Sequence, residues 1–462
     1  MTPYEQLLAR LLPARRFGVV LGLERMHAIF ERLGHPEHRL GRVVHVGGTN
    51  GKGSTVRFIA DLLRATGSRV ATYTSPHLSC LRERICLGTE LISEAEIVAA
   101  ADRVRAAGGD ELTFFEQLTA IACVAIAAWD VDVTVLEVGL GGRLDATNAV
   151  RAEVAVVTGV AMDHAAILGD TLAKIALEKA GIFKPHQRVV IGVSGEPAAV
   201  PVLIDAAQRA LARLSIVGEH DLAKVRSHRG WRHGEVQQRN AANAIVAVAA
   251  LDQGAAAFDL AALNPPPGRF EVIEEDDLDL VLDGAHNPHA AAALAGELRA
   301  RGIEPVVIIA ASSDKDVAGI AAALAPVARG VIATRYQQDR AMAPDALAEI
   351  MRTAVGSSAA SHAVGAPAAI GIEIEGAPSL AAPARDLVTR SIPVETAPTL
   401  AAALARVRDP AGPFYRGASG SVIHPRPEVV ITGSLFLVGE ARTLLLGAPT
   451  DPYVVTDPPA TP

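Results

Sequence analysis

A glycine-rich segment, VVHVGGTNGKGST at residues 43–55, carries the first groups that could do chemistry. A β-branched run leads into its glycines, and Lys52 and Ser54 follow them. Backbone N–H groups of such a loop, with the N-terminus of a helix starting near Ser54, can hold a phosphate, and Lys52 adds a mobile charge. The usual phosphate loop has four residues between its first glycine and the Gly-Lys pair, whereas only two separate Gly48 from Gly51. A glycine-rich turn with a solvated lysine is the alternative, but the order of strand, loop, lysine and helix favours nucleotide binding.

Two further apolar segments end in side chains that could bind a metal ion. Glu137 lies in the segment 133–138, and a carboxylate at the end of an apolar strand is costly unless something binds it. Magnesium is the natural partner beside a phosphate loop because it prefers carboxylate oxygens, and a salt bridge to Arg143 is the alternative. His164 follows the segment 154–158, where it could contact metal or phosphate, or be an ordinary core or surface histidine.

Other polar side chains also stand where elements are predicted to end. Lys179 lies near the end of an amphipathic segment, 171–180, where the helix dipole favours a cation. Asp283, His286 and Asn287 follow a later strand-like run. They could simply cap the next helix, or they could present polar groups to a cleft between two domains, which is a usual place for a site.

The elements that must position these side chains alternate along the chain. Strand-like apolar runs are predicted at 43–46, 133–138, 154–158, 188–192, 279–282, 305–310 and 428–432. Helical patterns are predicted at 54–65, 94–106, 115–128, 171–180, 240–251, 289–301 and 316–328. This alternation indicates an α/β fold with parallel sheets covered on both faces. Ligands of such sheets bind beyond the carboxyl ends of the strands.

The segment NPPPG at 264–268 is the clearest break in the chain. Three prolines cannot continue a helix or an interior strand, so we place a domain boundary there. We expect one domain over residues 1–266 and a second over residues 267–450. Residues 354–392, rich in Ala, Pro, Gly and Ser, are expected to form a surface insertion or partly ordered loop, and residues 451–462 a disordered tail.

The composition of the 462 residues is that of an ordinary soluble globular protein, with 50% hydrophobic and 20% charged residues. The formal net charge of −8 implies no basic surface for nucleic acid. Cys80, Cys86 and Cys123 are too few for a disulfide framework and lack zinc-ligand spacing. No signal-peptide pattern is present, and charges break the Ala-rich stretches before the roughly 18 apolar residues that a membrane helix needs. We expect a cytoplasmic monomer with no membrane or nucleic-acid partner.

Several segments together resemble the Mur ligase superfamily and, within it, the folylpolyglutamate synthase/dihydrofolate synthase family. The matching segments are LGLERM at 21–26, HVGGTNGKGST at 45–55, TSPHL at 74–78, ERI at 83–85, LTFFEQLTAIA at 112–122, LEVGLGGRLDATN at 136–148, MDHAAILGDTLAKIALEKAGI at 162–182, PGRFEVI at 267–273, LDGAHNPHA at 282–290, DKD at 314–316 and TGSLFLVGEAR at 432–442. The resemblance covers most of the chain. It implies an N-terminal P-loop-type parallel-sheet ATPase domain and a C-terminal Rossmann-like α/β domain, and it explains the spacing of the loop, since GTNGKGS is this superfamily's form.

The resemblance also implies a reaction. In that family the γ-phosphate of ATP passes to the carboxylate of a pteroate or folate, and the amine of L-glutamate attacks the acyl phosphate, giving an amide, ADP and phosphate. The implied cofactors are ATP and two Mg²⁺ ions, and the implied substrates are dihydropteroate or folate/tetrahydrofolate together with L-glutamate. The protein mainly positions the reactants and neutralises charge.

Roles for individual residues are carried over from the matching segments. The implied nucleotide contacts are Gly51, Lys52, Gly53, Ser54, Asn240, Arg269 and Asp283. Asn240 comes from HGEVQQRNAANA at 233–244, which matches the family's Gln-x-x-Asn-Ala pattern only loosely. The implied catalytic groups are Lys52, Lys179 and His286. The implied metal ligands are Ser75 and Glu137 for one Mg²⁺, His164 for a second, and Lys179 as a carbamate. The implied pterin-side pocket contains Leu21, Gly22, Thr113, Phe114, Phe115 and Glu116.

Three other functions compete with this interpretation. Another Mur-type ligase would add an amino acid to a UDP-sugar peptide, but LTFFEQLTAIA and LGLER favour the folate branch. A P-loop nucleotide switch is disfavoured by the offset loop and by the DGAHNP segment. A non-catalytic homologue is disfavoured by the retained Lys52, Glu137, His164 and Lys179.

Overall fold

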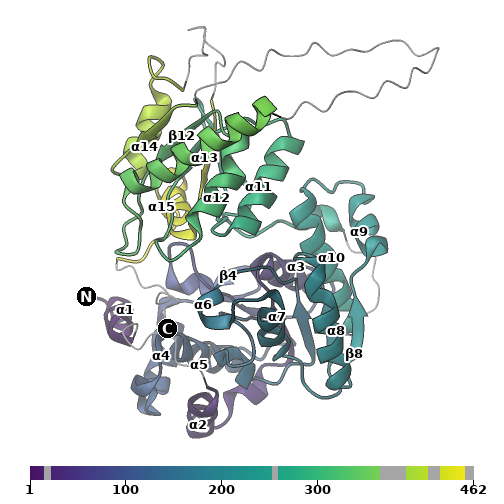
Figure 1. The fold of residues 1–462 in the computed structure, drawn as a ribbon. Coiled ribbons are helices and arrows are strands. Elements are labelled where there is room, and N and C mark those ends of the chain that lie inside the picture. Colours follow the sequence, from purple (N-terminus) through teal and green to yellow (C-terminus); the bar gives the residue numbers. More distant parts are fainter. Residues whose placement is uncertain (15–21, 252–258, 365–391, 415–426, 453–462) are drawn as a thin grey trace, which may run out of the picture. The chain divides into compact units, whose positions relative to one another are not determined.

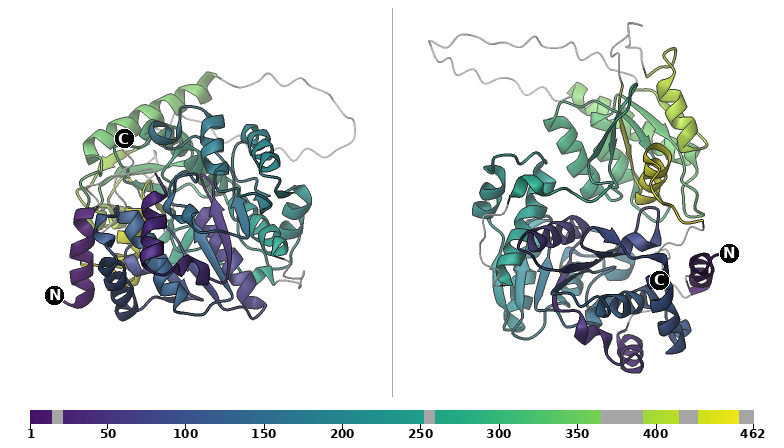
Figure 2. Two further views of the ribbon diagram at one scale, coloured as in Figure 1. Left: turned by 90° about the horizontal axis from the view of Figure 1, so that it is seen from below. Right: turned by 180° about the vertical axis from the view of Figure 1, so that it is seen from behind.

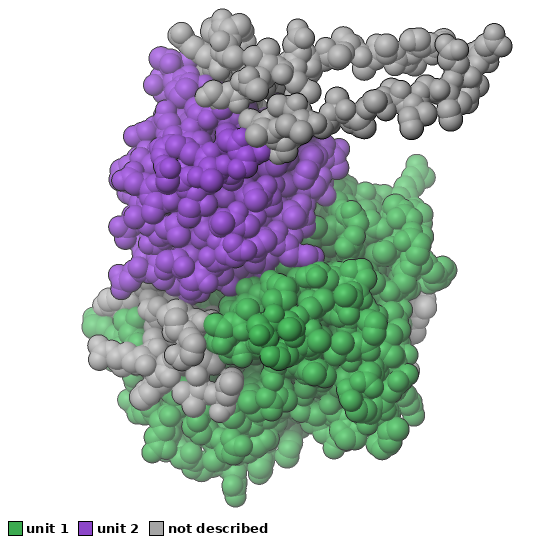
Figure 3. Space-filling view, viewed as in Figure 1, with its two compact units in different colours: residues 1–269, 442–462 green, residues 270–441 purple. Residues whose placement is uncertain are grey.

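The computed structural model describes residues 1–14, 22–251, 259–364, 392–414 and 427–452. The chain forms two compact units, residues 1–269 with 442–462 (unit 1) and residues 270–441 (unit 2), coloured separately in Figure 3. The change of unit after Arg269 lies next to the NPPPG segment, and the division into domains over 1–266 and 267–450 remains a proposal. No helix of the described residues is long and apolar enough to cross a membrane.

Unit 1 is built on an eight-stranded sheet with the strand order β4-β3-β2-β5-β1-β6-β7-β8. Its strands are β1 (Arg42–Gly47), β2 (Val70–Tyr73), β3 (Ile85–Leu87), β4 (Glu90–Leu91), β5 (Val133–Glu137), β6 (Val154–Val157), β7 (Arg188–Ile191) and β8 (Arg213–Ile216). Neighbours from β2 to β8 pair in parallel, and β3 and β4 add an antiparallel edge. The parallel sheet is confirmed, whereas its antiparallel edge was not predicted.

Helices cover both faces of this sheet (Figures 1 and 2). They are α1 (Pro3–Ala14), α2 (Glu24–Arg32), α3 (Lys52–Ala65), α4 (Glu94–Ala106), α5 (Phe114–Ala127), α6 (Ala165–Leu168), α7 (Leu172–Ala180), α8 (Val200–Arg209), α9 (Glu219–Arg226) and α10 (Glu235–Ala250). The core on one face is formed by α3 and α10. The core on the other is formed by α4 and α5 over one half of the sheet and by α7 and α8 over the other half.

The central strand β1 positions the residues at the edge of this sheet where its parallel strands end. Because side chains alternate along a strand, Val44 and Val46 pack toward α3 and α10, while Val43 packs into the opposite core. Val46 lies opposite Glu137 of β5 on one side and Val156 of β6 on the other. The carboxyl ends of these three parallel strands therefore meet, and the chain that follows each of them gathers at one edge.

Unit 2 has a six-stranded sheet with the order β13-β12-β11-β14-β10-β9. Its strands are β9 (Glu271–Glu274), β10 (Asp279–Leu282), β11 (Val306–Ile309), β12 (Gly330–Ala333), β13 (Val394–Thr396) and β14 (Glu428–Thr432), all parallel to their neighbours except β9. One face is covered by α11 (Pro288–Ala300), α12 (Val317–Leu324) and α13 (Pro344–Val364). On the opposite face lie α14 (Leu400–Arg408) and α15 (Leu435–Leu446) (Figure 2).

The predicted surface insertion or partly ordered loop over residues 354–392 is helical at its start. Residues 354–364 complete helix α13. This stretch reads AVGSSAASHAV, and its alanines, the best helix formers, let the helix run past Gly356. The remaining residues, 365–391, lie outside the described part of the chain.

The described end of the chain belongs to unit 1. Residues 442–452 group with unit 1 rather than with the second domain in which most of them were placed. Asp451 explains this, because its carboxylate accepts hydrogen bonds from the backbone N–H of Leu81 (2.7 Å) and from the hydroxyl of Tyr4 (2.9 Å). The rest of the predicted tail, residues 453–462, lies outside the described residues.

Candidate functional site

The glycine loop leaves β1 at Gly47 and enters α3 at Lys52, as the sequence predicts. Two of its glycines are required by their surroundings. Gly48 has φ +136° and Gly51 has φ +81°, which side chains other than glycine rarely adopt. A Cβ atom on Gly48 would lie 2.0 Å from Oγ1 of Thr158, and one on Gly51 would lie 2.2 Å from Oδ1 of Asn240. The loop is thus pressed between the end of β6 and helix α10.

Hydrogen bonds fix the loop to the chain that follows β6. The backbone N–H of Thr49 donates to the carbonyl of Gly159 (2.9 Å). The hydroxyl of Thr49 donates to the carbonyl of Ala161 (3.1 Å), and the hydroxyl of Thr158 donates to the carbonyl of Asn50 (2.7 Å). These hydrogen bonds hold the loop in a defined conformation before any ligand binds. Neither threonine was predicted to matter, although Thr158 is the last residue of the strand predicted at 154–158.

Lys52 bends back over the loop. Its Nζ atom donates to the carbonyls of Gly48 (3.3 Å) and Thr49 (3.2 Å), and the side chain is half-buried. These bonds hold a full positive charge directly above the backbone that would cradle a phosphate. Ser54, two residues further on, is buried in the first turn of α3.

Glu137 ends β5, as predicted, and its side chain is buried. The backbone N–H of Ser75 donates to its Oε2 atom (3.1 Å), and Gly53 lies against the carboxylate. Burial raises the pKa of Glu137, while the charge of Lys52 and the bond from Ser75 act in the opposite direction. The alternative pairing is wrong, because Arg143 forms its ion pair with Glu178 (2.8 Å).

Ser75 and Glu137, both proposed as ligands of one Mg²⁺, are thus adjacent in the structure. Their donor set suits a hard cation, since a carboxylate and a hydroxyl supply the oxygens that Mg²⁺ prefers. A buried carboxylate with a raised pKa also gains most from a bound cation. The residues present therefore fit such an ion.

Lys179 lies in the last turn of α7 but acts at the loop. Its side chain is buried, and Nζ donates to the carbonyl of Gly48 (3.0 Å), the same carbonyl that Lys52 reaches. Burial, followed by the charge of Lys52, lowers the pKa of Lys179 to about 7, against the opposing charges of Asp163 and Asp145. A considerable fraction of this amine is therefore neutral at neutral pH, unlike an ordinary helix-end lysine.

His164 follows β6 by several residues and has a left-handed backbone, with φ +51°. Its Nε2 atom lies 3.8 Å from Oδ1 of Asp163, whose charge in turn acts on Lys179. Asp163 therefore lies beside His164 and acts electrostatically on Lys179. Asp163, which precedes His164 in the segment 162–182, was not predicted as a site residue.

Asn240 and Arg269 complete the predicted nucleotide contacts of unit 1. Asn240 is buried on α10, where it accepts a hydrogen bond from Oγ of Ser194 (3.3 Å) and donates to Oε1 of Gln237 (3.2 Å). This places it against Gly51, although its sequence motif was a loose match. Burial raises the pKa of Glu137, and the positive charge of Arg269 is one of the smaller effects that oppose this rise.

The predicted residues of unit 2 shape a turn after β10. Asp283 accepts hydrogen bonds from the backbone N–H groups of Phe270 and Ala285, both at 2.9 Å. His286 places Nδ1 2.8 Å from the carbonyl of Gly284. Asn287 caps α11, so the capping alternative is correct for this residue.

The predicted pterin-side pocket is held together by its own side chains. Thr113 and Glu116 form a capping box at the start of α5, and Arg25 pairs with Glu116 (2.7 Å). Phe114 is fully buried, with the guanidinium of Arg84 5.6 Å from its ring centre. Arg84, itself buried and donating to His77 (2.9 Å), was not predicted to matter.

Phe115 and Gly22, also predicted for this pocket, take no part in the contacts just described. Phe115 lies beside Tyr73, with ring centres 6.2 Å apart, and against Gly139. Gly22 has φ +143°, and a Cβ atom there would meet Glu24. Leu21 lies outside the described residues.

Two family models match this chain. The Mur ligase middle domain matches residues 46–251, and the Mur ligase, glutamate ligase domain matches residues 268–388. A phosphate-loop α/β unit followed by such a domain defines the class of ATP-dependent amino-acid ligases. The dihydrofolate synthase/folylpolyglutamate synthase of Escherichia coli is 39% identical over 325 residues, which cover 66% of this chain and 76% of that protein. The chain belongs to the folylpolyglutamate synthase/dihydrofolate synthase family of Mur ligases.

Other relatives agree with this family. A Haloferax volcanii protein named "probable bifunctional folylpolyglutamate synthase/dihydropteroate synthase" is 33% identical over 476 residues, and the match spans 95% of this chain but only 50% of that protein. The structure of E. coli FolC in complex with DHPP and ADP has a TM-score of 0.76 at 28% identity, covering 96% of this chain and 98% of that one. A bifunctional folylpolyglutamate synthase/dihydrofolate synthase with Mn, AMPPNP and L-glutamate bound has a TM-score of 0.71 at 28% identity, covering 93% and 95%.

Proposed function

We propose that this chain is an ATP- and Mg²⁺-dependent ligase that adds L-glutamate to dihydropteroate, to the glutamate tail of (tetrahydro)folate, or to both. The family supports this proposal, as do the complexes of relatives with DHPP and ADP and with Mn, AMPPNP and L-glutamate. The observation that carries it is the gathering of Lys52, Glu137 and Lys179 around one preorganised glycine loop.

The proposed reaction has two steps. An oxygen of the substrate carboxylate attacks the γ-phosphorus of ATP, and the bond to the β-γ bridging oxygen breaks, which releases ADP and leaves an acyl phosphate. The amine of L-glutamate then attacks the acyl carbon, phosphate leaves with the bonding electrons, and the amine loses a proton as the amide forms. The first step makes a poor electrophile reactive by giving it a leaving group.

In this mechanism the loop and Lys52 act on the transferring phosphoryl group. Gly51, Gly53 and Ser54 direct backbone N–H groups toward the phosphates, and Lys52 exchanges its loop carbonyls for phosphate oxygens. Asn240 supports the loop from α10. Asp283 and His286 are proposed to contact the nucleotide from unit 2.

Glu137 with the hydroxyl of Ser75 would hold one Mg²⁺, and His164 with a carbamate on Lys179 would hold a second. Bound Mg²⁺ would neutralise phosphate charge. Carbamate formation needs a neutral amine, which the lowered pKa of Lys179 makes available. In this proposal the neutral amine attacks CO₂ and loses one proton, so that the neutral side chain becomes a carboxylate-like anion.

Several finer points also remain proposals. The pteroate or folate would lie beside Gly22, Thr113, Phe115 and Glu116, where Phe115 offers a partly buried aromatic face. Monomeric state and cytoplasmic location are proposed from the sequence alone. Since the match covers only half of the H. volcanii protein, no dihydropteroate synthase activity is proposed for this chain.

The test is ADP release by the purified full chain, with and without L-glutamate, on dihydropteroate and on tetrahydrofolate separately. We expect release to require Mg²⁺, one of the two acceptors and L-glutamate. Full-rate release without L-glutamate would contradict coupled ligation and favour a nucleotide switch. Turnover only with a UDP-sugar peptide would place the chain in the cell-wall branch instead.

A further inference from the structure

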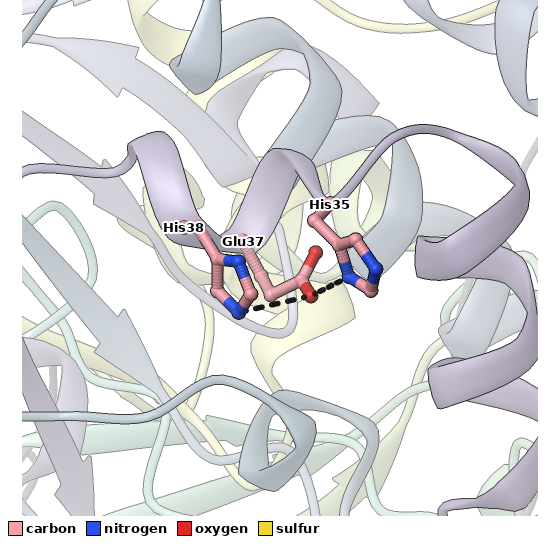
Figure 4. Close-up of side chains that lie close together, drawn as sticks. All are labelled: His35, Glu37 and His38. Carbon is pink, nitrogen blue, oxygen red and sulfur yellow. Dashed lines mark hydrogen bonds and ion pairs between the residues drawn. The ribbon is translucent and has the colours of Figure 1, made fainter.

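A compact group of metal-ligating side chains lies away from the phosphate loop, on the turn between α2 and β1. His35, Glu37 and His38 each offer one ligand atom, and these atoms all lie within 4.8 Å of one another (Figure 4). Oε1 of Glu37 is 2.9 Å from Nδ1 of His35 and 3.6 Å from Nε2 of His38. None of these residues belongs to the family segments or to the proposed catalytic site.

The backbone explains why three neighbours in sequence converge. Helix α2 ends in a Schellman motif. The backbone N–H of Gly34 donates to the carbonyl of Glu31 (3.1 Å), and that of His35 donates to the carbonyl of Phe30 (2.8 Å). Gly34 and His35 both have positive φ, +74° and +54°. The chain then turns at Pro36 into the short 3₁₀ helix η2 (Pro36–Arg39).

This turn places the two rings on either side of the Glu37 carboxylate. The imidazoles of His35 and His38 stack with their centres 5.0 Å apart and their planes 10° apart. Figure 4 shows the Glu37 carboxylate between them, with one oxygen directed at both rings. Both histidines are exposed, so an ion could enter from solvent.

Glu37 provides a second, independent observation. Its side chain is only 9% exposed, and its Oε2 atom is buried without a hydrogen-bond partner among the described residues. A buried carboxylate oxygen without a partner is costly.

We propose that His35, Glu37 and His38 bind a divalent transition-metal ion of the Zn²⁺ class. Two imidazole nitrogens and one carboxylate oxygen suit such borderline ions better than Mg²⁺. Bonds of about 2.0–2.1 Å at tetrahedral angles place neighbouring ligand atoms about 3.3 Å apart. The two observed separations from Glu37, 2.9 Å and 3.6 Å, lie on either side of that value, and the two histidine ligand atoms lie within 4.8 Å of each other. Because the ring planes are nearly parallel, the exposed imidazoles would rotate toward a common point when an ion binds.

The expected consequence of binding is structural. The turn packs against α5 and leads directly into β1, the strand that carries the phosphate loop. An ion held by three side chains of one turn would fix the connection between α2 and β1. Because imidazole must be neutral to bind a metal, Zn²⁺ binding should weaken as the pH falls.

The experiment is a Zn²⁺ titration of the metal-free full chain, without nucleotide and with excess MgCl₂, using competition with a chromophoric chelator. We expect one Zn²⁺ per chain. His35→Ala, His38→Ala and Glu37→Gln should each weaken binding by more than the roughly 10–100-fold that loss of a supporting group costs at metal sites. The matched control is His220→Ala, an exposed histidine on α9, which should leave the affinity unchanged.

Two further readouts keep the proposal testable if a variant is unstable. Zn²⁺ should raise the melting temperature of the wild type but not that of Glu37→Gln, and Co²⁺ should give a visible spectrum that His38→Ala lacks. Equal Zn²⁺ affinity in wild type, His38→Ala and Glu37→Gln would overturn the proposal. Absence of a stoichiometric site in the wild type would equally overturn it and would leave the cluster as a hydrogen-bonded ion pair.

Discussion

Two carboxylates of unit 1 are buried to the same degree and are held in opposite ways. Glu116 is 4% exposed at the start of α5, and Glu137 is 5% exposed at the end of β5. Glu116 accepts hydrogen bonds from the guanidinium of Arg25 and from the backbone N–H of Thr113. Glu137 accepts one from the backbone of Ser75, and burial raises its pKa.

The difference teaches that burial alone does not identify a ligand. The charge of Glu116 is offset within the fold, so that carboxylate serves chiefly to hold α5 and α2 together. The charge of Glu137 is offset only in part, by Lys52 and by more distant arginines. Glu137 therefore has the greater capacity to bind a cation. We expect substitutions that remove a charge at the phosphate-loop edge to reduce activity more than stability.

The largest expected effect is that of Lys52→Ala. A preorganised charge on a transferring group is worth on the order of 10²–10³ in rate, so glutamate-dependent ADP formation should fall by about that factor. Folding should change little, because Lys52 is half-buried and bonds only to loop carbonyls. Turnover rates and thermal melting curves measure the two quantities.

The matched control is Lys174→Ala, which removes an exposed lysine of α7 that pairs with Asp170. Its turnover should equal that of the wild type. If the turnover of Lys52→Ala stays within a few-fold of the wild-type value, Lys52 has no part in the mechanism. Charges at the phosphate-loop edge would then matter no more for chemistry than those around Glu116.

The next effect in size is that of Lys179→Arg. Arginine keeps the positive charge but cannot form a carbamate, so turnover should fall by on the order of 10² under saturating ATP, Mg²⁺ and substrates. Lys179→Ala should fall similarly and regain part of its activity with added short carboxylic acids. The control is Lys184→Arg, since burial also lowers the pKa of Lys184. Normal turnover by Lys179→Arg would show that Lys179 acts as a simple cation.

The positions of the phosphate-loop residues could be predicted because strand ends are local features of the sequence. The apolar runs that became β1, β5 and β6 are long and β-branched, and adjacent parallel strands bring their carboxyl ends together. Glu137 and Lys52 followed from that rule. Asn240 came from a loose motif, yet it lies against Gly51.

What could not be predicted depends on contacts between segments far apart in the chain. The anchoring of the loop by Thr158 requires knowledge of which strands are neighbours. The pairing of Arg25 with Glu116 joins helices 91 residues apart, so the sequence presented Glu116 only as a pocket residue. The depressed pKa of Lys179 arises from burial, which periodicity alone did not reveal for a residue in a last helical turn.

A paired substitution tests the two carboxylates directly. Glu116→Gln loses a charge-assisted interaction with Arg25, so the free energy of unfolding should fall by about 1.5–3 kcal/mol. Glu137→Gln resembles the protonated form that burial favours, so the metal-free protein should be as stable as the wild type or more stable at neutral pH. Its turnover should nevertheless fall more than that of Glu116→Gln. Denaturant unfolding and ADP release measure the two effects, and the reverse pattern would refute the comparison.

The last expected effect is a gradual pH dependence of stability that originates at Lys179. The folded pKa of about 7 lies below the ordinary value of 10.5, so between these pH values the unfolded chain carries a proton that the native chain lacks. The free energy of unfolding should therefore rise with pH across this window, by at most about 1.4 kcal/mol per pH unit from this group. Below about pH 7 both states bind the proton, and this contribution to the slope vanishes.

Lys179→Met should flatten the rise in CO₂-free buffer, whereas Lys174→Met, at an exposed and ion-paired position, should preserve it. Equal slopes in Lys179→Met and wild type would mean that Lys179 is fully protonated in the native state, and the carbamate proposal would lose its chemical basis.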